Sequence, residues 1–353
     1  MLSPLRYPGG KRRLVRYIER WLAFNELRPT VFVEPFTGGA AVSLHVLERD
    51  LADEVILADL DPLVAAFWKT VFDREGSQWL IERILTTPVT LAKWRALKRA
   101  EPKNDRERAF TCLFLNRTSF SGILHHRAGP IGGMQQVSAY GIDCRFPRER
   151  LARRIHEIAK FSDRVRVWHK SWRETVSLVS RMQDRGTVAG RVCYYCDPPF
   201  FNKAALLYRH IFRTADHEAL RDTLLAVRDD WCLSYDVAEE LHKLWKEVER
   251  PRANIELLYQ MPQRIATEAI LSNLDLPGGD GPIDAAPRGA QPQGAALTSP
   301  PSARQPMLSL PVVAWTPVKP RSAEPIADVP GRATHSRSVT PANRPRLVPD
   351  GES

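Results

Sequence analysis

The hydrophobic residues of positions 1–276 alternate between strand-like runs and helix-like spacing. Apolar runs at 30–36 and 54–59 are each followed by helical spacing, at 40–48 and 62–72. Helical spacing also covers 14–24, and another predicted helix starts near Thr214. The remaining strand-like runs are 164–168, 191–197, 231–235, 253–260 and 268–272. Strand and helix signals in this order predict one α/β sheet domain.

The stretch from 74 to 163 breaks this alternation, because it is mostly helical in pattern and rich in Arg and Lys. It also contains a glycine-rich loop at 129–133. We therefore predict a helical, basic insertion at 74–163 that separates the first part of the sheet domain, 1–73, from the second part, 164–276.

Composition changes sharply at Pro277. The segment 277–353 holds 15 of the 28 prolines, and Trp315 is its only aromatic residue. A segment of this kind cannot bury enough apolar surface to offset its chain entropy, so we predict that it is disordered.

The formal net charge is +10, from 51 Lys and Arg against 41 Asp and Glu. A basic excess favours a polyanionic partner. No apolar run is long enough to predict a membrane span, and five cysteines in 353 residues do not indicate a disulfide scaffold. These features predict a reduced, cytoplasmic protein without a membrane partner.

The segment Asp197-Pro198-Pro199-Phe200 directly follows an apolar strand-like run. In an open α/β sheet, ligands bind beyond the carboxyl ends of the strands. The prolines are rigid and leave carbonyl groups free to accept hydrogen bonds. A carboxylate, a free carbonyl and an aromatic face suit the exocyclic amine of a nucleobase; a plain strand-to-turn junction is the alternative interpretation.

A second segment, Glu34-Pro35-Phe36-Thr37-Gly38-Gly39, joins a strand to a helix. It matches neither the dinucleotide fingerprint nor a Walker loop, so a cofactor without phosphates is indicated. Asp59 ends the next strand, where an acid that binds a ribose belongs.

No metal site is predicted. Cys193 and Cys196 have no second pair, and a spacing of three along a strand points them to opposite faces. The pairs His125–His126 and His210–His217 lack further ligands, so these cysteines and histidines are expected to play no part in a metal centre.

Two further segments complete a family pattern: Tyr7-Pro8-Gly9-Gly10-Lys11, and Leu115-Asn116-Arg117 with the loop after it. The four segments, in this order, resemble the D12 class of N6-adenine DNA methyltransferases, which includes the Dam enzymes, over about residues 5–275. The resemblance implies a Rossmann-like S-adenosylmethionine-dependent methyltransferase sheet with an inserted, mostly helical target-recognition domain. It also implies a bacterial or phage origin and association with the nucleoid.

The resemblance assigns roles to individual residues. It implies catalytic roles for Asp197, Pro198 and Phe200, which would hold the target adenine. It implies contacts to S-adenosylmethionine, with no metal, for Tyr7, Lys11, Glu34, Phe36, Gly38, Asp59 and Asp197. It implies that the region after the Leu-Asn-Arg segment faces double-stranded DNA; the candidate contacts are Arg117, Phe120, Ser121, His125, Arg127 and Gln135.

The sequence departs from the Dam pattern mainly in the loop Thr118-Ser119-Phe120-Ser121-Gly122 and in residues 125–136. We therefore predict that residues 116–150 select a DNA sequence other than GATC. Arg117 has an alternative role in which it braces the loop or holds a phosphate. The sequence identifies no restriction endonuclease partner, and a monomer is compatible with it.

Two other functions remain open. One is methyl transfer to cytosine N4, an RNA adenine or a protein glutamine. Cytosine-N4 enzymes favour Ser-Pro-Pro and glutamine enzymes favour Asn-Pro-Pro, so Asp197 argues against both. The other is DNA binding without catalysis, against which the intact Asp197 and Gly38-Gly39 argue.

Overall fold

The computed structural model describes residues 3–6, 11, 14–201, 209, 211–248, 252–260 and 263–277, with backbone alone for 252–260 and 263–267. Its sheet half contains seven strands: β1 (Val31–Glu34), β2 (Glu54–Asp59), β3 (Val165–His169), β4 (Val192–Cys196), β5 (Asp230–Asp236), β6 (Arg252–Gln260) and β7 (Gln263–Ser272). Each corresponds to a predicted strand. Most of the predicted tail, from residue 278 on, lies outside the described residues.

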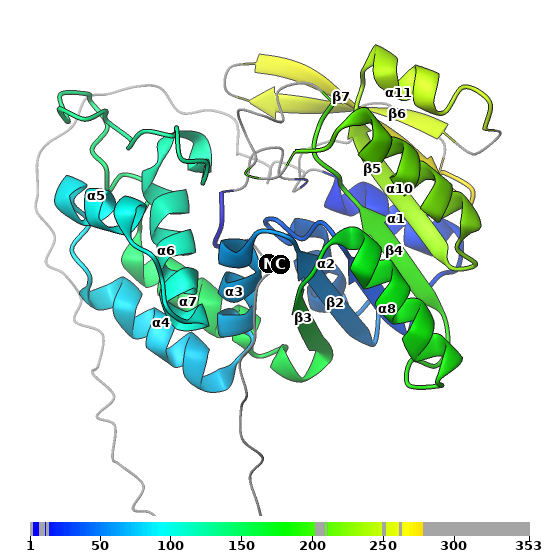
Figure 1. The fold of residues 1–353 in the computed structure, drawn as a ribbon, viewed down its shortest axis with the longest axis horizontal. Coiled ribbons are helices and arrows are strands. Elements are labelled where there is room, and N and C mark those ends of the chain that lie inside the picture. The colour runs from blue at the N-terminus through cyan, green and yellow to red at the C-terminus, as the bar shows by residue number, and fades with distance from the viewer. Residues whose placement is uncertain are drawn as a thin grey trace, which may run out of the picture. The chain divides into compact units, whose positions relative to one another are not determined.

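The seven strands form one sheet in the order β3-β2-β1-β4-β5-β7-β6. The first five are parallel, whereas β7 is antiparallel to both β5 and β6. The carboxyl ends of the five parallel strands therefore lie at one edge of the sheet, and β7 runs back from that same edge (Figure 1).

Helices cover both faces of the sheet (Figure 1). The helices of this half are α1 (Val15–Phe24), α2 (Ala41–Glu48), α3 (Pro62–Val71), α8 (Trp172–Asp184), α10 (Thr214–Ala226) and α11 (Glu239–Leu244). Local signals explain where they begin: α3 has a proline in its first turn and Asp61 as its cap, and α8 has a capping box between Ser171 and Glu174.

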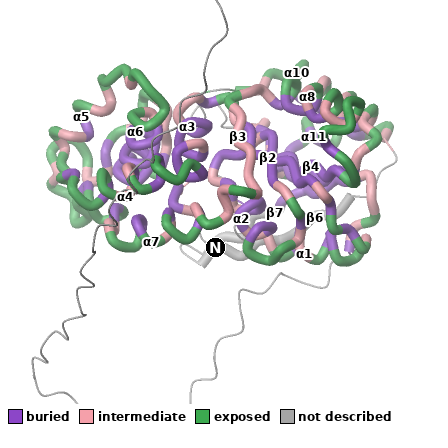
Figure 2. Tube along the Cα trace, turned by 90° about the horizontal axis from the view of Figure 1, so that it is seen from below, coloured by how far each residue is buried: buried purple, intermediate pink, exposed green. Residues whose placement is uncertain are grey.

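Alternate residues of each strand enter different hydrophobic cores. Phe32, Cys193 and Tyr195 pack with α1, α2 and α3, whereas Tyr194 and Cys196 pack with α8 and α10. Strands buried on both faces read as continuous apolar runs, which is why the sequence marked them clearly. Figure 2 shows the central strands as buried and the outer helix surfaces as exposed.

The range 74–163 contains α4 (Arg74–Thr86), α5 (Leu91–Arg99), α6 (Asp105–Thr118) and α7 (Arg148–Ala159), and two 3-10 turns, η1 (Phe120–Gly122) and η2 (Ser162–Arg164), follow α6 and α7. The core that holds α3 continues into these helices through Phe110, Phe114 and Ile155. The helical part thus packs on the sheet half through α3. In the described part of the chain, no helix has the length and apolarity needed to cross a membrane.

Candidate functional site

Four neighbouring strands each end in an acid at the same edge of the sheet. Glu34 ends β1, Asp59 ends β2, Asp197 follows β4 and Asp236 ends β5. Burial raises the pKa of each carboxyl; that of Glu34 rises to about 8 and that of Asp59 to about 7. Such a cluster of perturbed acids marks a candidate site with a physical cause.

The turn between β1 and α2 depends on Gly38 and Asp59. Gly38 has a positive φ of 42°, and its N–H donates to Oδ2 of Asp59 at 2.8 Å. The second oxygen, Oδ1, accepts from the N–H of Asp61 at 2.8 Å. Asp59 therefore holds two backbone turns in place at the mouth of the sheet.

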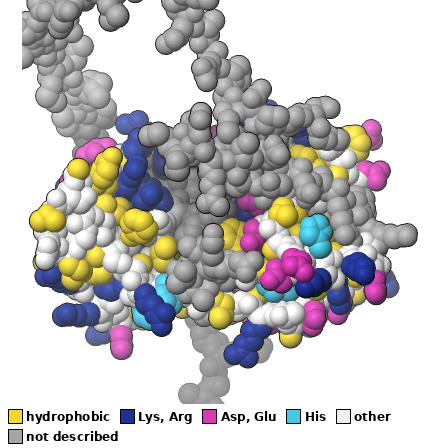
Figure 3. Space-filling view, turned by 90° about the horizontal axis from the view of Figure 1, so that it is seen from above, with side chains coloured by type: hydrophobic (Ala, Val, Ile, Leu, Met, Phe, Trp, Pro, Cys, Tyr) yellow, Lys and Arg dark blue, Asp and Glu magenta, His cyan; other side chains and the backbone are white. Residues whose placement is uncertain are grey.

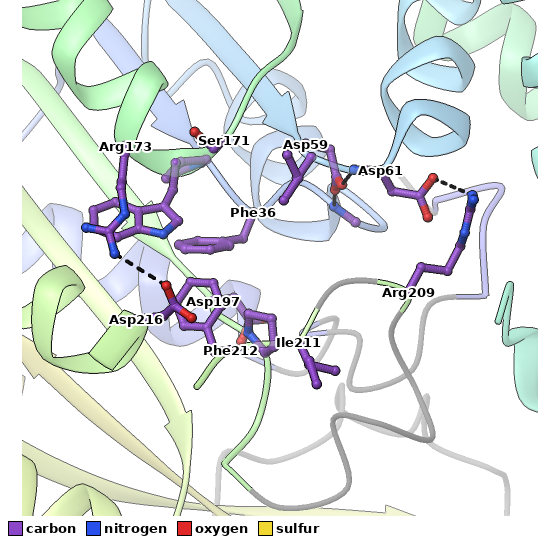
Figure 4. Close-up of a pocket in the computed structure, with 15 residues that line it drawn as sticks. Phe36, Asp59, Asp61, Ser171, Arg173, Asp197, Arg209, Ile211, Phe212 and Asp216 are labelled. Atoms are coloured by element: carbon purple, nitrogen blue, oxygen red, sulfur yellow. Dashed lines mark hydrogen bonds and ion pairs between the residues drawn. The ribbon is translucent and has the colours of Figure 1, made fainter. Parts of the chain in front are cut away.

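A pocket opens beside this turn (Figure 4). Acids Asp59 and Asp61 line one side, and Phe36 and Phe212 line the middle with ring centroids 5.6 Å apart. Asp197 lies on the same wall as Phe212. Ion pairs tie the rim together at Arg209–Asp61, 2.9 Å, and Arg173–Asp216, 3.4 Å. The pocket is apolar in its middle and has acids paired with arginines at its ends.

The carboxylate of Asp197 is held from two sides. Lys11 Nζ lies 3.0 Å from Oδ1, and the hydroxyl of Ser234 donates to the same oxygen at 3.2 Å. Ser234 in turn lies 2.9 Å from the hydroxyl of Tyr195. Burial raises the pKa of Tyr195 well above its usual value, so this phenol keeps its proton and can donate to Ser234. Both contacts of Asp197 use Oδ1, and neither uses Oδ2.

Lys11 is 4% exposed and bridges two carboxylates. Its Nζ lies 3.0 Å from Asp197 and 3.1 Å from Oε2 of Glu268 on β7, and 5.0 Å from the ring centroid of Phe200. Burial raises the pKa of Glu268 to about 7, although the charge of Lys11 opposes this shift. The ammonium group therefore balances buried negative charge beside the Asp-Pro-Pro-Phe segment.

The segment after Asp197 is anchored by aromatic packing. Phe201 stacks on His217 at 4.0 Å and lies 5.0 Å from the ring of Tyr235. The Nδ1 of His217 lies 2.8 Å from the hydroxyl of Tyr235. Burial lowers the pKa of His217 to about 4, so the imidazole is neutral at pH 7. Pro198 is buried as well, so the segment is held by packing on both sides of Phe200 in the sequence.

The structure separates the predicted cofactor residues. Phe36, Gly38, Asp59 and Asp197 line the pocket. Lys11 instead contacts Asp197 and Glu268. Glu34 is 3% exposed, and its Oε2 accepts from the N–H of Ser43 at 3.2 Å, in the first turn of α2. The remaining prediction, Tyr7, lies outside the described residues. The cofactor roles of all these residues stay predictions.

Sequence reasoning missed Ser234, Tyr195 and Glu268. Ser234 lies in a predicted strand, but only the pairing of β5 with β4 brings it beside Asp197. Glu268 reaches the site because β7 is antiparallel, which opposes Glu268 to Asp236. No local sequence signal marks either contact.

The predicted DNA contacts follow the end of α6. Phe120 is 68% exposed, and Ser121 has a positive φ of 54°. His125 and Arg127 line a shallow hollow with Phe120, and Gln135 is exposed beyond it. Arg117 differs from these residues, because it is only 6% exposed.

The structure describes no metal centre. Among the described residues, no group of three or more His, Cys, Asp or Glu side chains is arranged to hold an ion. Cys193 and Cys196 are buried free thiols that pack into opposite cores, as predicted from their spacing.

The strand order with its antiparallel seventh strand defines a Rossmann-like methyltransferase fold. The family model of D12 class N6 adenine-specific DNA methyltransferases matches residues 7–261, and the chain belongs to this family. The resemblance found in the sequence is thereby confirmed. Among curated proteins, none matches this chain.

Two solved structures resemble the chain weakly. An rRNA methyltransferase from Streptomyces viridochromogenes shares 15% identity over 75% of this chain and 85% of its own, with a TM-score of 0.37. A provisionally assigned RNA methyltransferase from Pyrococcus horikoshii shares 14% identity over 76% and 84%, with a TM-score of 0.31. At these scores neither bears on the substrate.

Proposed function

We propose that this chain transfers a methyl group from S-adenosylmethionine to the N6 amine of an adenine rotated out of duplex DNA. The observation that carries the proposal is Asp197, whose carboxylate lines the pocket while Lys11 and Ser234 hold Oδ1. An acceptor of fixed orientation at this edge of the sheet suits an exocyclic amine.

The pocket fits a cofactor of this kind. Asp59 and Asp61 place carboxylate oxygens in the pocket, where they could accept hydrogen bonds from hydroxyl groups of the cofactor, and Asp61 also pairs with Arg209. Phe36 and Phe212 offer apolar faces between them. The cofactor, when bound, supplies an electrophilic methyl group. Phe36, Gly38 and Asp59 are the residues that would hold it.

The target base would be held by the Asp-Pro-Pro-Phe segment. Removal of a base from the duplex costs a few kcal/mol, and stacking on Phe200 returns about 1–3 kcal/mol. The Oδ2 of Asp197 and the carbonyl of Pro198 would accept the two hydrogens of the amine. Because these acceptors would draw the nitrogen toward a tetrahedral form, its lone pair would become more nucleophilic. On accepting the methyl group, whose bond to sulfur breaks, the nitrogen would become positively charged and would then lose one proton to water.

Lys11 keeps this acceptor charged. Burial raises the pKa of Asp197, whereas the positive charge of Lys11 lowers it. Without that charge, the carboxyl would bind a proton more readily and would be a weaker hydrogen-bond acceptor for the amine. Lys11 and Ser234 are therefore positioning residues for Asp197.

The loop after α6 would face the DNA. Phe120, Ser121, His125, Arg127 and Gln135 lie on or beside it, and the exposed ones can reach base edges or phosphates. We propose that this loop selects a sequence other than GATC, since its residues differ from the Dam-like loop.

Methyl transfer by the full chain to duplex DNA tests the proposal. Labelled S-adenosylmethionine is supplied with adenine-containing DNA, and the product is digested to nucleosides. We expect labelled N6-methyladenine, and mapping in a methylation-free host would give the sequence. Label found only in cytosine, RNA or protein would overturn the adenine assignment, and cofactor binding without transfer to any of them would favour a non-catalytic role.

A further inference from the structure

Two buried hydroxyl groups lie behind Asp197 in a continuous hydrogen-bonded chain. The hydroxyl of Ser234 lies 3.2 Å from Oδ1 of Asp197, and the hydroxyl of Tyr195 lies 2.9 Å from that of Ser234. Tyr195 and Ser234 are both 0% exposed, whereas the side chain of Asp197 is 22% exposed. The chain of hydrogen bonds therefore leads from the core of the sheet half to the carboxylate that lines the pocket.

Strand pairing brings these three polar groups together. Tyr195 and Asp197 are two positions apart at the end of β4, so their side chains leave the same side of the strand. In the parallel pairing of β4 with β5, Cys232 is the partner of Tyr195, which places Ser234 two positions further toward the carboxyl edge. The 2.9 Å contact shows that the tyrosine side chain spans this diagonal. The register between β4 and β5 thus decides which hydroxyl meets the Asp197 carboxylate.

The chemistry of the three groups fixes the direction of the hydrogen bonds. An ionised carboxylate has only acceptors, so Ser234 donates its single proton to Asp197. A Ser234 proton turned toward Tyr195 would instead set two acceptor oxygens against each other at 3.2 Å. The oxygen of Ser234 therefore accepts from Tyr195. The phenol of Tyr195 has the proton that this direction requires, because burial raises its pKa well above the usual value.

We infer that Tyr195 is a positioning residue for methyl transfer, because its donation to Ser234 fixes the hydroxyl that holds Oδ1 of Asp197. The inference rests on the proposed function, in which Oδ2 of Asp197 accepts a hydrogen of the target amine. A serine hydroxyl rotates to suit its partners, and a second hydrogen bond restricts that rotation. Hydrogen bonds in a chain also polarise one another, so a hydroxyl that accepts from Tyr195 is a stronger donor to Asp197.

Tyr195 acts from a distance, because it cannot touch a substrate. Asp and Glu side chains of the sheet half reach the surface along the border with the undescribed residues (Figure 3), whereas Tyr195 is enclosed in the core that also contains Phe32. The adjacent Tyr194 offers a comparison. It is 1% exposed in the opposite core, and its hydroxyl has no hydrogen-bond partner within the described part of the chain. The two tyrosines therefore differ in the contact that carries the inference.

Four variants of the full chain test the role of Tyr195. Tyr195→Phe removes the hydroxyl and keeps the ring, Ser234→Ala removes the group between Tyr195 and Asp197, and the double variant removes both. Tyr194→Phe is the matched control, since it removes a buried phenol hydroxyl outside the chain of hydrogen bonds. Single-turnover methyl transfer to duplex DNA is measured at saturating S-adenosylmethionine and DNA. Affinities for the duplex and for S-adenosylhomocysteine are measured as well, and they also show that each variant is folded.

We expect Tyr195→Phe to slow methyl transfer about 3- to 10-fold, the usual effect of one neutral hydrogen bond. Ser234→Ala, which removes a bond to a charged group, should slow it about tenfold or more. The double variant should be no slower than Ser234→Ala, because Tyr195 acts only through Ser234. Tyr194→Phe should match wild type, and both affinities should be unchanged in all four variants.

Three results would overturn the inference. The first is a wild-type rate in Tyr195→Phe, and the second is equal slowing in Tyr195→Phe and Tyr194→Phe, which would indicate a general effect of core packing. The third is a further loss of rate, as large as in wild type, when Tyr195→Phe is added to Ser234→Ala. That result would show that Tyr195 acts without Ser234.

Urea unfolding of the same variants tests the hydrogen bond without methyl transfer. If Tyr195 donates to Ser234, the double variant should lose less unfolding free energy than the sum of the two single losses, and additive losses would contradict the bond. A wild type that methylates no adenine would overturn the proposed function and the role of Tyr195 in it. An active wild type with an equally active Tyr195→Phe would overturn this inference alone.

Discussion

The carboxyl edge of the sheet differs in its buried charges from a group of five arginines, Arg6, Arg117, Arg145, Arg150 and Arg154, which we call the arginine cluster. At the edge, Lys11 lies between Asp197 and Glu268 at 3.0 and 3.1 Å, so charges of opposite sign balance within the protein. In the arginine cluster, Arg117 is equally buried, but its charged neighbours are also arginines. The first arrangement holds its acceptor in place through an opposite charge, whereas in the second, like charges surround a buried guanidinium.

The largest expected effect is the loss of methylation rate when Asp197, the proposed hydrogen-bond acceptor, is replaced. Asp197→Asn replaces one carboxylate oxygen by a donor, so the methylation rate should fall at least about 100-fold, the typical cost of one positioned catalytic hydrogen-bonding group. Duplex affinity should be retained. Single-turnover methyl transfer measures the rate, and fluorescence anisotropy measures duplex affinity. The control is Asp163→Asn, at an exposed acid in η2. A rate within twofold of wild type would exclude the proposed role.

Removal of the Lys11 charge should shift the pH dependence of the reaction. Burial raises the pKa of Asp197 and Lys11 lowers it, so Lys11→Met should move the acid limb of kcat/KM to higher pH. Near pH 7 the rate should fall roughly tenfold, with partial recovery at higher pH.

Glu268→Gln should have the opposite, smaller effect. It removes a negative charge that competes for Lys11, so the acid limb should move to lower pH. The rate at pH 7 should stay within about threefold, because a carboxyl with a pKa of about 7 carries only part of its charge at that pH. If Lys11→Met and Glu268→Gln moved the acid limb of kcat/KM in the same direction, the proposed opposite effects of Lys11 and Glu268 on Asp197 would be contradicted.

Asp59→Asn should weaken cofactor binding more than DNA binding. Each oxygen of Asp59 accepts from a backbone N–H at 2.8 Å, and an amide can replace only one of these acceptors. One unpaired amide costs about 1–3 kcal/mol, so we expect roughly tenfold weaker binding of S-adenosylhomocysteine by calorimetry. Asp184→Asn, at the exposed end of α8, is the control. Unchanged affinity would remove Asp59 from the cofactor site.

The last expected effect concerns stability and not the reaction. Burial raises the pKa of Glu34 from 4.5 to about 8, so this group favours the folded state fully below pH 4.5 and loses that contribution as the pH rises to about 8. Glu34→Gln does not titrate and can still accept from Ser43. Its free energy of unfolding, from urea titrations, should exceed that of wild type by on the order of 1–3 kcal/mol at pH 8. The difference should vanish at pH 4; a constant difference would contradict the buried-acid account.

Much of the sheet could be predicted from the sequence because its signals are local. Strands buried on both faces appear as apolar runs, and the glycine turn and Asp-Pro-Pro-Phe segment lie at their ends. The helix α8 was not predicted, although Ser171 and Glu174 form a capping box that the sequence already displays. That omission was a missed local signal.

The contacts that orient the site were decided by tertiary structure. The sequence predicts that Lys11 contacts the cofactor and does not indicate its partners in the protein. Pairing of β5 with β7 brings Glu268 to the carboxyl edge, where Glu268 and Asp197 both contact the ammonium group of Lys11. Arg117 was predicted to face DNA, and its burial follows from the packing of α6 against neighbouring segments. Sequence spacing along one strand or helix determines which face a residue occupies. It does not determine which distant residue lies opposite, because that depends on strand order and on how helices pack.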